Sequence, residues 1–328
     1  MLKTILFGGT NRERLVSVAS AQAVAAALPD ADLWFQAPDG RVFEADREKL
    51  FAHERPFELD FPADGRPVGE IEIALDRAAS EGRVLILAQH GGAAENGQLA
   101  ALAEARHVAF TGSGAAASKL AFDKAATKAV VSKQGVAVPP TVSVETAAED
   151  FQRIGRLVAK PVAEGSSYGL IFVNGPEDLE RLAEAAKREA YLVEPFIAGS
   201  EATCGVLERA DGSLVALPPI EIVPGEGAFD YKGKYLTATT QEICPARFAP
   251  AVNAALQAGA LAAHRAVGAK GYSRSDFIVT PSGVVFLEIN TLPGLTKASL
   301  YPKALGVQGI AFADFLEGQI ALAERRYA

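Results

Sequence analysis

The stretch from Gly271 to Leu300 constrains the fold of this chain more than any other part of the sequence. It holds two apolar runs, Phe277 to Val279 and Val284 to Leu287, on either side of the turn-forming sequence Pro281-Ser282-Gly283. Short apolar runs around such a turn predict a β-hairpin. An antiparallel hairpin folds back on itself, so its two outer ends should lie beside each other.

Four polar side chains mark those outer ends. On the first strand Arg274 and Asp276 share one face, because side chains alternate across a strand. On the second strand Glu288 and Asn290 share one face for the same reason. The hairpin should therefore gather two carboxylates, an amide oxygen and a guanidinium at the rim of a sheet, and such oxygen ligands suit Mg²⁺. A solvated hairpin end with ordinary salt bridges is the alternative, since exposed ion pairs are common and weak.

Composition limits the class of protein. The 328 residues allow two or three domains, and 32 basic against 40 acidic residues give a net charge of −8. That balance argues against a broad nucleic-acid surface but leaves room for a local basic pocket. No apolar run reaches the length of about 18 residues that spans a membrane, so no membrane partner is expected. The two cysteines, Cys204 and Cys244, form no CxxC motif, which favours a cytoplasmic protein with reduced thiols.

The N-terminal part has the pattern of an α/β domain. An apolar run from Leu2 to Phe7 ends at two glycines, and a helical pattern follows over residues 15–28. Glu13 lies at the start of this helix, where an acidic side chain alone would be unremarkable. A second buried strand, Val84 to Ala88, ends just before His90, at the strand end where open α/β sheets place ligands. His90 could equally be a packed or solvated histidine.

The middle of the chain carries lysines and small-residue loops. A helix predicted from Ala115 to Gln134 holds Lys124, and a strand over residues 157–159 leads to Lys160. The loop from Glu164 to Gly169 could wrap phosphates with its backbone N–H groups, or could be an ordinary hairpin turn. The segment over residues 225–235 could be a functional lid or a surface loop. Further helices are expected over residues 70–80, 97–105, 176–190, 249–268 and 310–326, and further strands over residues 107–110, 170–173, 191–196, 201–207 and 214–222.

Taken together, these motifs resemble the D-alanine–D-alanine ligases of the ATP-grasp superfamily, over nearly the full length. The resemblance is carried by eight motifs in order: GGTNRERLVS from Gly8, HGGAAENG from His90, FTGSGAAASKLAFDK from Phe110, KPVAEGSSYG from Lys160, VEPFIAGSE from Val193, DYKGKYL from Asp230, SRSDF from Ser273 and LEINTLPGLTKASL from Leu287. The resemblance implies a three-domain fold: an N-terminal open parallel α/β domain over residues 1–112, then two α+β domains over 113–195 and 196–328 that enclose ATP.

In that family ATP phosphorylates the carboxylate of one D-alanine, and the amine of a second attacks the acyl phosphate. The resemblance implies that Asp276, Glu288 and Asn290 hold two Mg²⁺ ions, for which Mn²⁺ could substitute. It assigns a larger set to ATP: Lys124 and Lys160 to the α- and β-phosphates, Lys234 to the γ-phosphate, the backbone around Ser166 and Ser167 as a cover, and Glu194, Ile197 and Glu201 to the adenine and ribose pocket.

The resemblance assigns the residues that would bind the amino-acid substrates in the same way. Glu13 would pair with the first D-alanine's ammonium, and His90 would lie near its carboxylate. Arg274 and the Gly294 amide would steady the oxyanion of the tetrahedral intermediate. Ser299 and Leu300 would receive the second carboxylate. Ser166 and Tyr235 would complete a hydrogen-bonded set with Glu13, and a tyrosine at this position favours an amine over a hydroxyl nucleophile.

Departures from the family pattern keep other functions open. Asn96 replaces an aspartate, Pro195 replaces a base-contacting lysine, and Lys297 adds a charge near the second-substrate motif, where Leu292 and Leu295 are also atypical. An ATP-grasp ligase that joins other amino acids is therefore one alternative, and a non-catalytic nucleotide-binding relative is another. Dimers are usual among similar ligases, so a homodimer is expected.

Overall fold

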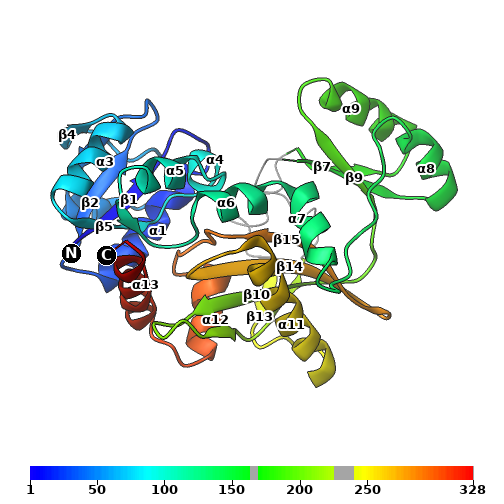
Figure 1. Cartoon of the computed structure of the whole chain (residues 1–328). Coiled ribbons are helices and arrows are strands. Elements are labelled where there is room, and N and C mark those ends of the chain that lie inside the picture. Colours follow the sequence, from blue (N-terminus) through cyan, green and yellow to red (C-terminus); the bar gives the residue numbers. More distant parts are fainter. Residues whose placement is uncertain (163–168, 225–239, 328) are drawn as a thin grey trace.

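The computed structural model describes residues 1–162, 169–224 and 240–327. Figure 1 shows three parts: a blue and cyan N-terminal part, a green part with α8 and α9 at its top, and a larger part that carries the hairpin. Within the described ranges, no helix is long and apolar enough to cross a membrane. The domain boundaries at residues 112 and 195 stay predictions.

The N-terminal part is built on a six-stranded sheet with the strand order β4-β3-β2-β1-β5-β6. Its strands are β1 (Leu2–Gly8), β2 (Asp32–Gln36), β3 (Val42–Glu44), β4 (Arg66–Gly69), β5 (Arg83–Leu87) and β6 (Ala109–Phe110). Its helices are α1 (Arg14–Ala27), α2 (Arg47–Ala52), α3 (Ile71–Ser80), α4 (Gly92–Glu95) and α5 (Gln98–Glu104). The pairs β1–β2, β1–β5 and β5–β6 are parallel, as the sequence predicts, whereas β3 and β4 extend one edge in the antiparallel sense.

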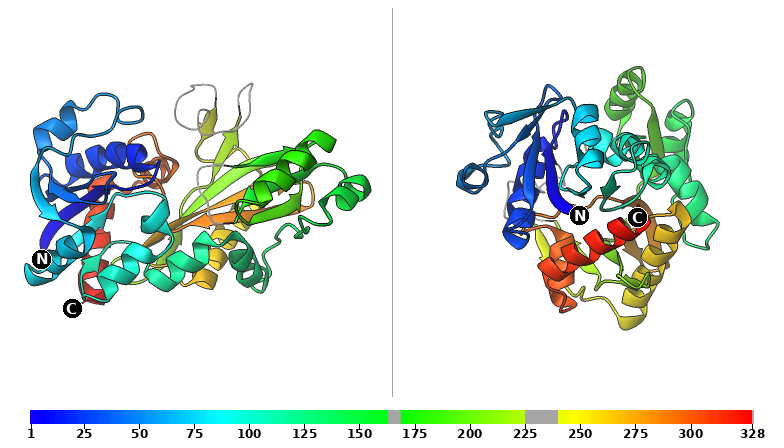
Figure 2. Two further views of the ribbon diagram at one scale, coloured as in Figure 1. Left: turned by 90° about the horizontal axis from the view of Figure 1, so that it is seen from above. Right: turned by 60° about the vertical axis from the view of Figure 1, so that its left-hand side comes forward.

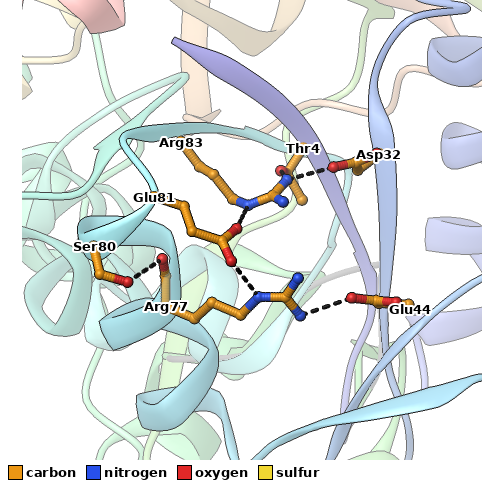
Figure 3. A network of polar contacts seen from close by, with 7 residues as sticks. All are labelled: Thr4, Asp32, Glu44, Arg77, Ser80, Glu81 and Arg83. Atoms are coloured by element: carbon orange, nitrogen blue, oxygen red, sulfur yellow. Dashed lines mark hydrogen bonds and ion pairs between the residues drawn. The ribbon is translucent and has the colours of Figure 1, made fainter.

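A charged network closes this sheet at the end opposite to the predicted ligand loops (Figure 3). The buried Arg83 donates to Asp32 and Glu81 at 2.5 Å each and to the Thr4 hydroxyl at 2.8 Å. Its guanidinium also lies 5.1 Å from the centre of the Trp34 ring. Arg83 and Asp32 are the first residues of β5 and β2. The network therefore fastens the amino ends of the strands, and the carboxyl ends are left for ligands.

The helix predicted from Ala115 to Gln134 is instead two helices, α6 (Ala115–Phe122) and α7 (Lys124–Ser132). Asp123 separates them with an extended backbone (φ −84°, ψ 101°), and its side chain accepts a hydrogen bond from the Ala126 amide at 2.9 Å. An aspartate that caps a helix competes with the continuous helix backbone, which explains the break. Lys124 consequently becomes the first residue of a new helix.

The central part is a three-stranded antiparallel sheet with the order β8-β7-β9. Its strands are β7 (Leu157–Pro161), β8 (Ile171–Val173) and β9 (Tyr191–Pro195), and its helices are α8 (Ala147–Ile154) and α9 (Pro176–Ala186). The two helices and the sheet share a small core that includes Leu157, Leu182 and Val193. The sequence predicts the strands and α9, although α9 ends four residues before the predicted Ala190, and it does not predict α8.

The hairpin is confirmed as β14 (Tyr272–Thr280) and β15 (Gly283–Asn290), the end of a sheet with the order β13-β12-β10-β14-β15. The other strands are β10 (Ser200–Glu208), β11 (Leu214–Ala216), β12 (Ile220–Val223) and β13 (Gln241–Ile243), and the helices are α11 (Pro250–Val267), α12 (Leu300–Val307) and α13 (Phe312–Arg326). The single strand predicted over residues 214–222 is two strands, because Pro218 and Pro219 between them donate no backbone hydrogen bond. The helix α12 is not predicted from the sequence.

One hydrophobic core joins the two ends of the chain. Phe315 and Ile320 of α13 belong to the same buried cluster as Ile5 of β1 and Phe110 of β6. The N-terminal amine also lies 3.0 Å from the Glu324 carboxylate. Figure 2 shows both termini at the same end of the molecule. The N-terminal sheet and the C-terminal helices are thus held in a fixed relation, with the hairpin between them and the central part.

Replacing Arg83 with methionine should lower the free energy of unfolding by about 2 kcal/mol, because its hydrogen bonds to charged partners are lost and Asp32 and Glu81 keep their charge. Urea denaturation followed by circular dichroism measures the change. Arg41 is the matched control, since it also lies over an aromatic ring, at 5.5 Å from Phe43, but is exposed. A change for Arg83→Met as small as that for Arg41→Met would show that the network adds no stability.

Candidate active site

A cavity of about 550 Å³ lies between the central three-stranded sheet and the hairpin. Seven of the residues selected from the sequence line it: Lys124, Lys160, Glu194, Ile197, Glu201, Asp276 and Glu288. They come from α7, β7, β9, β10, β14 and β15 and from the loop between β9 and β10. Residues up to 164 positions apart in the sequence, from Lys124 to Glu288, thus meet on the walls of a single cavity.

Part of the cavity lining is apolar. Its walls include Val158, Phe172, Phe196, Ile278 and Leu287. The rings of Phe172 and Phe196 meet edge to face with their centres 6.2 Å apart. A flat apolar slot of this kind suits an aromatic base, which buries its faces and leaves its edge for a few polar groups.

The cavity lining is also charged, and its charges are paired. Lys160 Nζ lies 3.2 Å from one oxygen of Glu194, and Lys128 forms an ion pair with the other oxygen. Lys124 Nζ lies 3.6 Å from Glu288. Lys124 and Lys160 thus line the cavity with carboxylate partners, whereas Lys128 is buried behind its wall.

At the hairpin rim, the strand register confirms the shared face predicted from the sequence. Asp276 lies opposite Glu288, and Arg274 lies opposite Asn290. Arg274 binds Asp276 through two hydrogen bonds of 3.0 Å each. The Asn290 side-chain oxygen accepts from the Leu292 amide at 2.7 Å. Asp276 and Glu288 both line the cavity, the first with a side chain that is 15% exposed and the second with one that is 39% exposed, and their role as metal ligands stays a prediction.

The rim offers hard oxygen donors to a metal ion, but not a cluster built from three acidic, histidine or cysteine side chains. No such cluster occurs in the described ranges. Asp276 and Glu288 on opposite strands, with the amide of Asn290 two residues further on, form a donor set that fits Mg²⁺, which takes one or two carboxylates and completes its shell with water and phosphate oxygens.

Thr203 is a site residue that the sequence analysis misses. It lies opposite Asp276 on β10, and its hydroxyl donates to the Asp276 carboxylate at 2.6 Å. The only sequence signal is a polar residue within an otherwise buried strand. Together with Arg274, Thr203 fixes the orientation of this carboxylate.

His90 connects the N-terminal sheet to the loop that follows the hairpin. Its Nδ1 donates to the Leu292 carbonyl at 3.2 Å, so in the neutral ring Nε2 accepts from the Ser20 hydroxyl at 2.7 Å. Burial lowers the pKa of His90 to about 4, against a weaker opposing effect of the hydrogen bond to Leu292. The Leu295 amide also donates to the Ser20 hydroxyl, at 3.4 Å. His90 is thus a buried neutral histidine that orients the loop.

Glu13 lies against the glycine turn after β5. A Cβ atom on Gly91 would stand 2.0 Å from a carboxylate oxygen of Glu13, and Gly91 has a φ of +65°, so only glycine suits this position. The Gly91 amide donates to Glu95 at 2.9 Å. Burial, and next the nearby Glu13 carboxylate, raise the pKa of Glu95 to about 8. The carboxyl groups of Glu13 and Glu95 therefore lie close together at the turn after β5, where they would stabilise a ligand cation.

Gly294 and Ser299 lie side by side in the loop between β15 and α12. A Cβ atom on Gly294 would come within 2.8 Å of the Ser299 hydroxyl oxygen. That oxygen accepts from the Thr296 amide at 3.1 Å. Ser299 immediately precedes α12, and Leu300 is the first residue of that helix. Gly294, one of the two residues predicted for the oxyanion, thus lies in the same loop as Ser299, which is predicted for the second carboxylate.

Four predicted residues, Ser166, Ser167, Lys234 and Tyr235, lie outside the described residues. The same holds for most of the small-residue loop from Glu164 to Gly169 and for the segment over residues 225–235. Their roles stay predictions.

Comparison of the chain with known proteins identifies the family to which it belongs. The D-ala D-ala ligase N-terminus model matches residues 3–113, and the D-ala D-ala ligase C-terminus model matches residues 141–321. A D-alanine--D-alanine ligase from Desulforudis audaxviator is 36% identical, with 98% of each chain covered. The chain belongs to the D-alanine–D-alanine ligase family.

Other relatives agree with this assignment. The D-alanine--D-alanine ligase from Geobacter sulfurreducens is 36% identical over 98% of this ligase and 93% of its own length. Among solved structures, the VanG D-Ala:D-Ser ligase from Enterococcus faecalis is 27% identical with a TM-score of 0.80, and it covers 100% and 99% of the two chains. The resemblance and the ATP-grasp fold predicted from the sequence are confirmed, as is an ATP-dependent ligase as the class of enzyme.

Between pH 6.5 and pH 4, this ligase should lose stability as the pH falls, partly because of His90. Its folded pKa of about 4 lies below the ordinary value of 6.5, so in this window the unfolded chain binds the proton more readily. The His90→Gln variant lacks this contribution, and its melting temperature should fall less on acidification. Thermal melts at steps of half a pH unit measure the difference. Parallel pH profiles for the two proteins would contradict the buried neutral state of His90.

Proposed function

We propose that this protein joins two D-alanines into D-alanyl-D-alanine at the expense of ATP, through an acyl phosphate, and that the product serves peptidoglycan precursor synthesis in the cytoplasm. The main support is the cavity, where an apolar slot, paired lysines and two opposed carboxylates meet two residue pairs away from Arg274. The near full-length relatives named D-alanine--D-alanine ligase support the choice of substrate.

In the first step, an oxygen of the first D-alanine's carboxylate attacks the γ-phosphorus of ATP. The bond to the β-phosphate oxygen breaks, ADP leaves, and an acyl phosphate forms. The apolar slot beside Ile197 holds the adenine, Glu201 faces the ribose, and Lys124 and Lys160 bind the α- and β-phosphates. Asp276, Glu288 and Asn290 would hold Mg²⁺, which when bound neutralises the developing charge on the phosphate oxygens.

In the second step, the amine of the second D-alanine attacks the carbonyl carbon of the acyl phosphate. The amine loses a proton, the tetrahedral intermediate collapses, and inorganic phosphate leaves. Arg274 and the Gly294 amide donate hydrogen bonds to the oxyanion, a role in which one donor contributes about 3 kcal/mol. In the structure Arg274 is bound to Asp276 on the same strand, so it is already held at the hairpin rim.

Charged groups of the two D-alanines would be recognised by complementary groups of the protein. Glu13 would pair with the first D-alanine's ammonium, next to the turn at Gly91, and His90 would orient the loop near its carboxylate. Ser299 and Leu300 would receive the second carboxylate. The structure adds support for this last assignment, because both residues stand at the N-terminus of α12, where backbone N–H groups favour an anion.

A ligase that joins D-alanine to another small amino acid is a second candidate. It is favoured by the exposed Lys297 beside the second-substrate loop. No observation favours a non-catalytic nucleotide-binding protein. We also propose a homodimer, which is usual among similar ligases and which light scattering can test.

An amino-acid panel with release of inorganic phosphate as the readout separates the two candidates. D-Alanine alone should support ATP-dependent phosphate release and yield D-alanyl-D-alanine. Adding D-serine to D-alanine should yield little mixed dipeptide by mass spectrometry. If D-alanine alone gives no phosphate while a mixed pair does, the first proposal fails and the second holds.

The Asp276→Asn and Glu288→Gln variants should lower Mg²⁺-dependent phosphate release by about a hundredfold or more, because each removes a charged ligand from the proposed metal site. Circular dichroism should show folded proteins. Asp211→Asn, in an exposed turn after β10, is the matched control and should keep full turnover. Near-normal turnover of either site variant at saturating Mg²⁺ would contradict the metal assignment.

A further inference from the structure

Glu194 is a buried carboxylate that two lysines share. Its side chain is 3% exposed; Lys160 approaches one oxygen at 3.2 Å, and Lys128 pairs with the other. Lys128 itself is 5% exposed and points to Glu194 from α7. Lys160 and Glu194 line the cavity, whereas Lys128 does not. One lysine of the pair can thus reach a ligand, and the other lies behind the cavity wall.

Only one of the two lysines could exchange Glu194 for another ion-pair partner. Lys160 extends from β7 into the cavity, where nucleotide phosphates could replace Glu194 as its partner. Lys128 is enclosed and has no access to a ligand in the cavity. If Lys160 were the only partner of Glu194, moving it to a phosphate would leave a buried carboxylate without a counter-ion, which desolvation makes strongly unfavourable. With Lys128 in place, Glu194 remains paired.

We infer that Lys128 is a positioning residue for the nucleotide: it is the permanent counter-ion of Glu194 and thereby leaves Lys160 able to exchange from Glu194 to the phosphates. This inference rests on the proposed function, because it requires a nucleotide in the cavity. It gives a role to a residue that neither the metal site nor the oxyanion site uses. The exchange involves no bond making, only a change of ion-pair partner.

The electrostatics of the cluster support this division of roles. Burial, followed by repulsion from Lys160, lowers the pKa of Lys128 to about 8, although Glu194 and the more distant Glu288 raise it. The two lysines therefore compete for one carboxylate. A phosphate that draws Lys160 away relieves the repulsion and strengthens the pair between Lys128 and Glu194.

The position of Lys128 also follows from the break at Asp123. Because α7 begins at Lys124, Lys128 lies one turn later on the same face of a new helix. Lys124 reaches Glu288 on the hairpin, and Lys128 reaches Glu194 on the central sheet. The helix thus supplies a cation to each wall of the cavity.

The test is calorimetric titration of the full-length protein with ADP in the presence of Mg²⁺. In Lys128→Met, Glu194 should retain Lys160, and the affinity for Mg²⁺–ADP should fall at least tenfold. The KM for D-alanine should change less than twofold, since the amino-acid end is untouched. In Lys128→Arg, which keeps a buried cation beside Glu194, the affinity should stay within threefold of that of the wild type. Lys133→Met, at the exposed end of α7, is the matched control and should bind like the wild type.

Each outcome is decisive. If the wild type does not bind Mg²⁺–ADP, the proposed function fails. If the wild type binds and Lys128→Met binds equally well, the inference is wrong. If Lys128→Arg is folded and binds as weakly as Lys128→Met, the charge of Lys128 has no role, and the inference is again wrong. Should Lys128→Met fail to fold, Lys128→Arg still tests the idea: binding within threefold of the wild type supports it, and a tenfold or larger loss overturns it.

Discussion

The register between β14 and β15 is the constraint on which the site depends. It places Asp276 opposite Glu288 and Arg274 opposite Asn290. A slip of one residue would turn these side chains to the face that packs on α11, where Phe277 and Phe286 now fill the core. The burial of those two aromatic rings therefore holds the carboxylates in the cavity. On β14 the strand alternation separates the two faces, whereas on β15 a register shift opposite Asp276 and Phe277 lets Phe286 pack in the core while Glu288 lines the cavity.

The sequence predicts this hairpin well because its signals are local. Apolar runs, a turn and polar end residues lie within 20 positions of one another, and the period of two fixes their faces. The parallel strands β1 and β5 are also predictable, since each is a buried apolar run shortly before a pair of glycines. Lys124 and Lys160 stand out for a different reason: they fall in motifs that resemble those of a known family.

Other parts of the structure depend on partners far along the chain. The break between α6 and α7 arises from the cap at Asp123, which a periodic apolar pattern hides. The helix α12 is short, and its burial against α13 and the N-terminal core gives it a stability that its own sequence does not indicate. Lys128 meets Glu194 across 66 positions, so no local pattern could show that the two lysines share a carboxylate.

The charges of the cavity are compensated within the protein itself. Lys124 pairs with Glu288, Lys160 with Glu194, Arg274 with Asp276, and Arg247 with Glu221 at the cavity wall. A folded chain that gathered these charges without partners would be destabilised by desolvation. A polyanionic ligand with its cation can instead exchange partners with these pairs. Binding then replaces one set of ion pairs with another. The selectivity of the site depends on which ion pairs can break to bind a ligand and which, like the pair of Lys128 with Glu194 behind the cavity wall, stay intact.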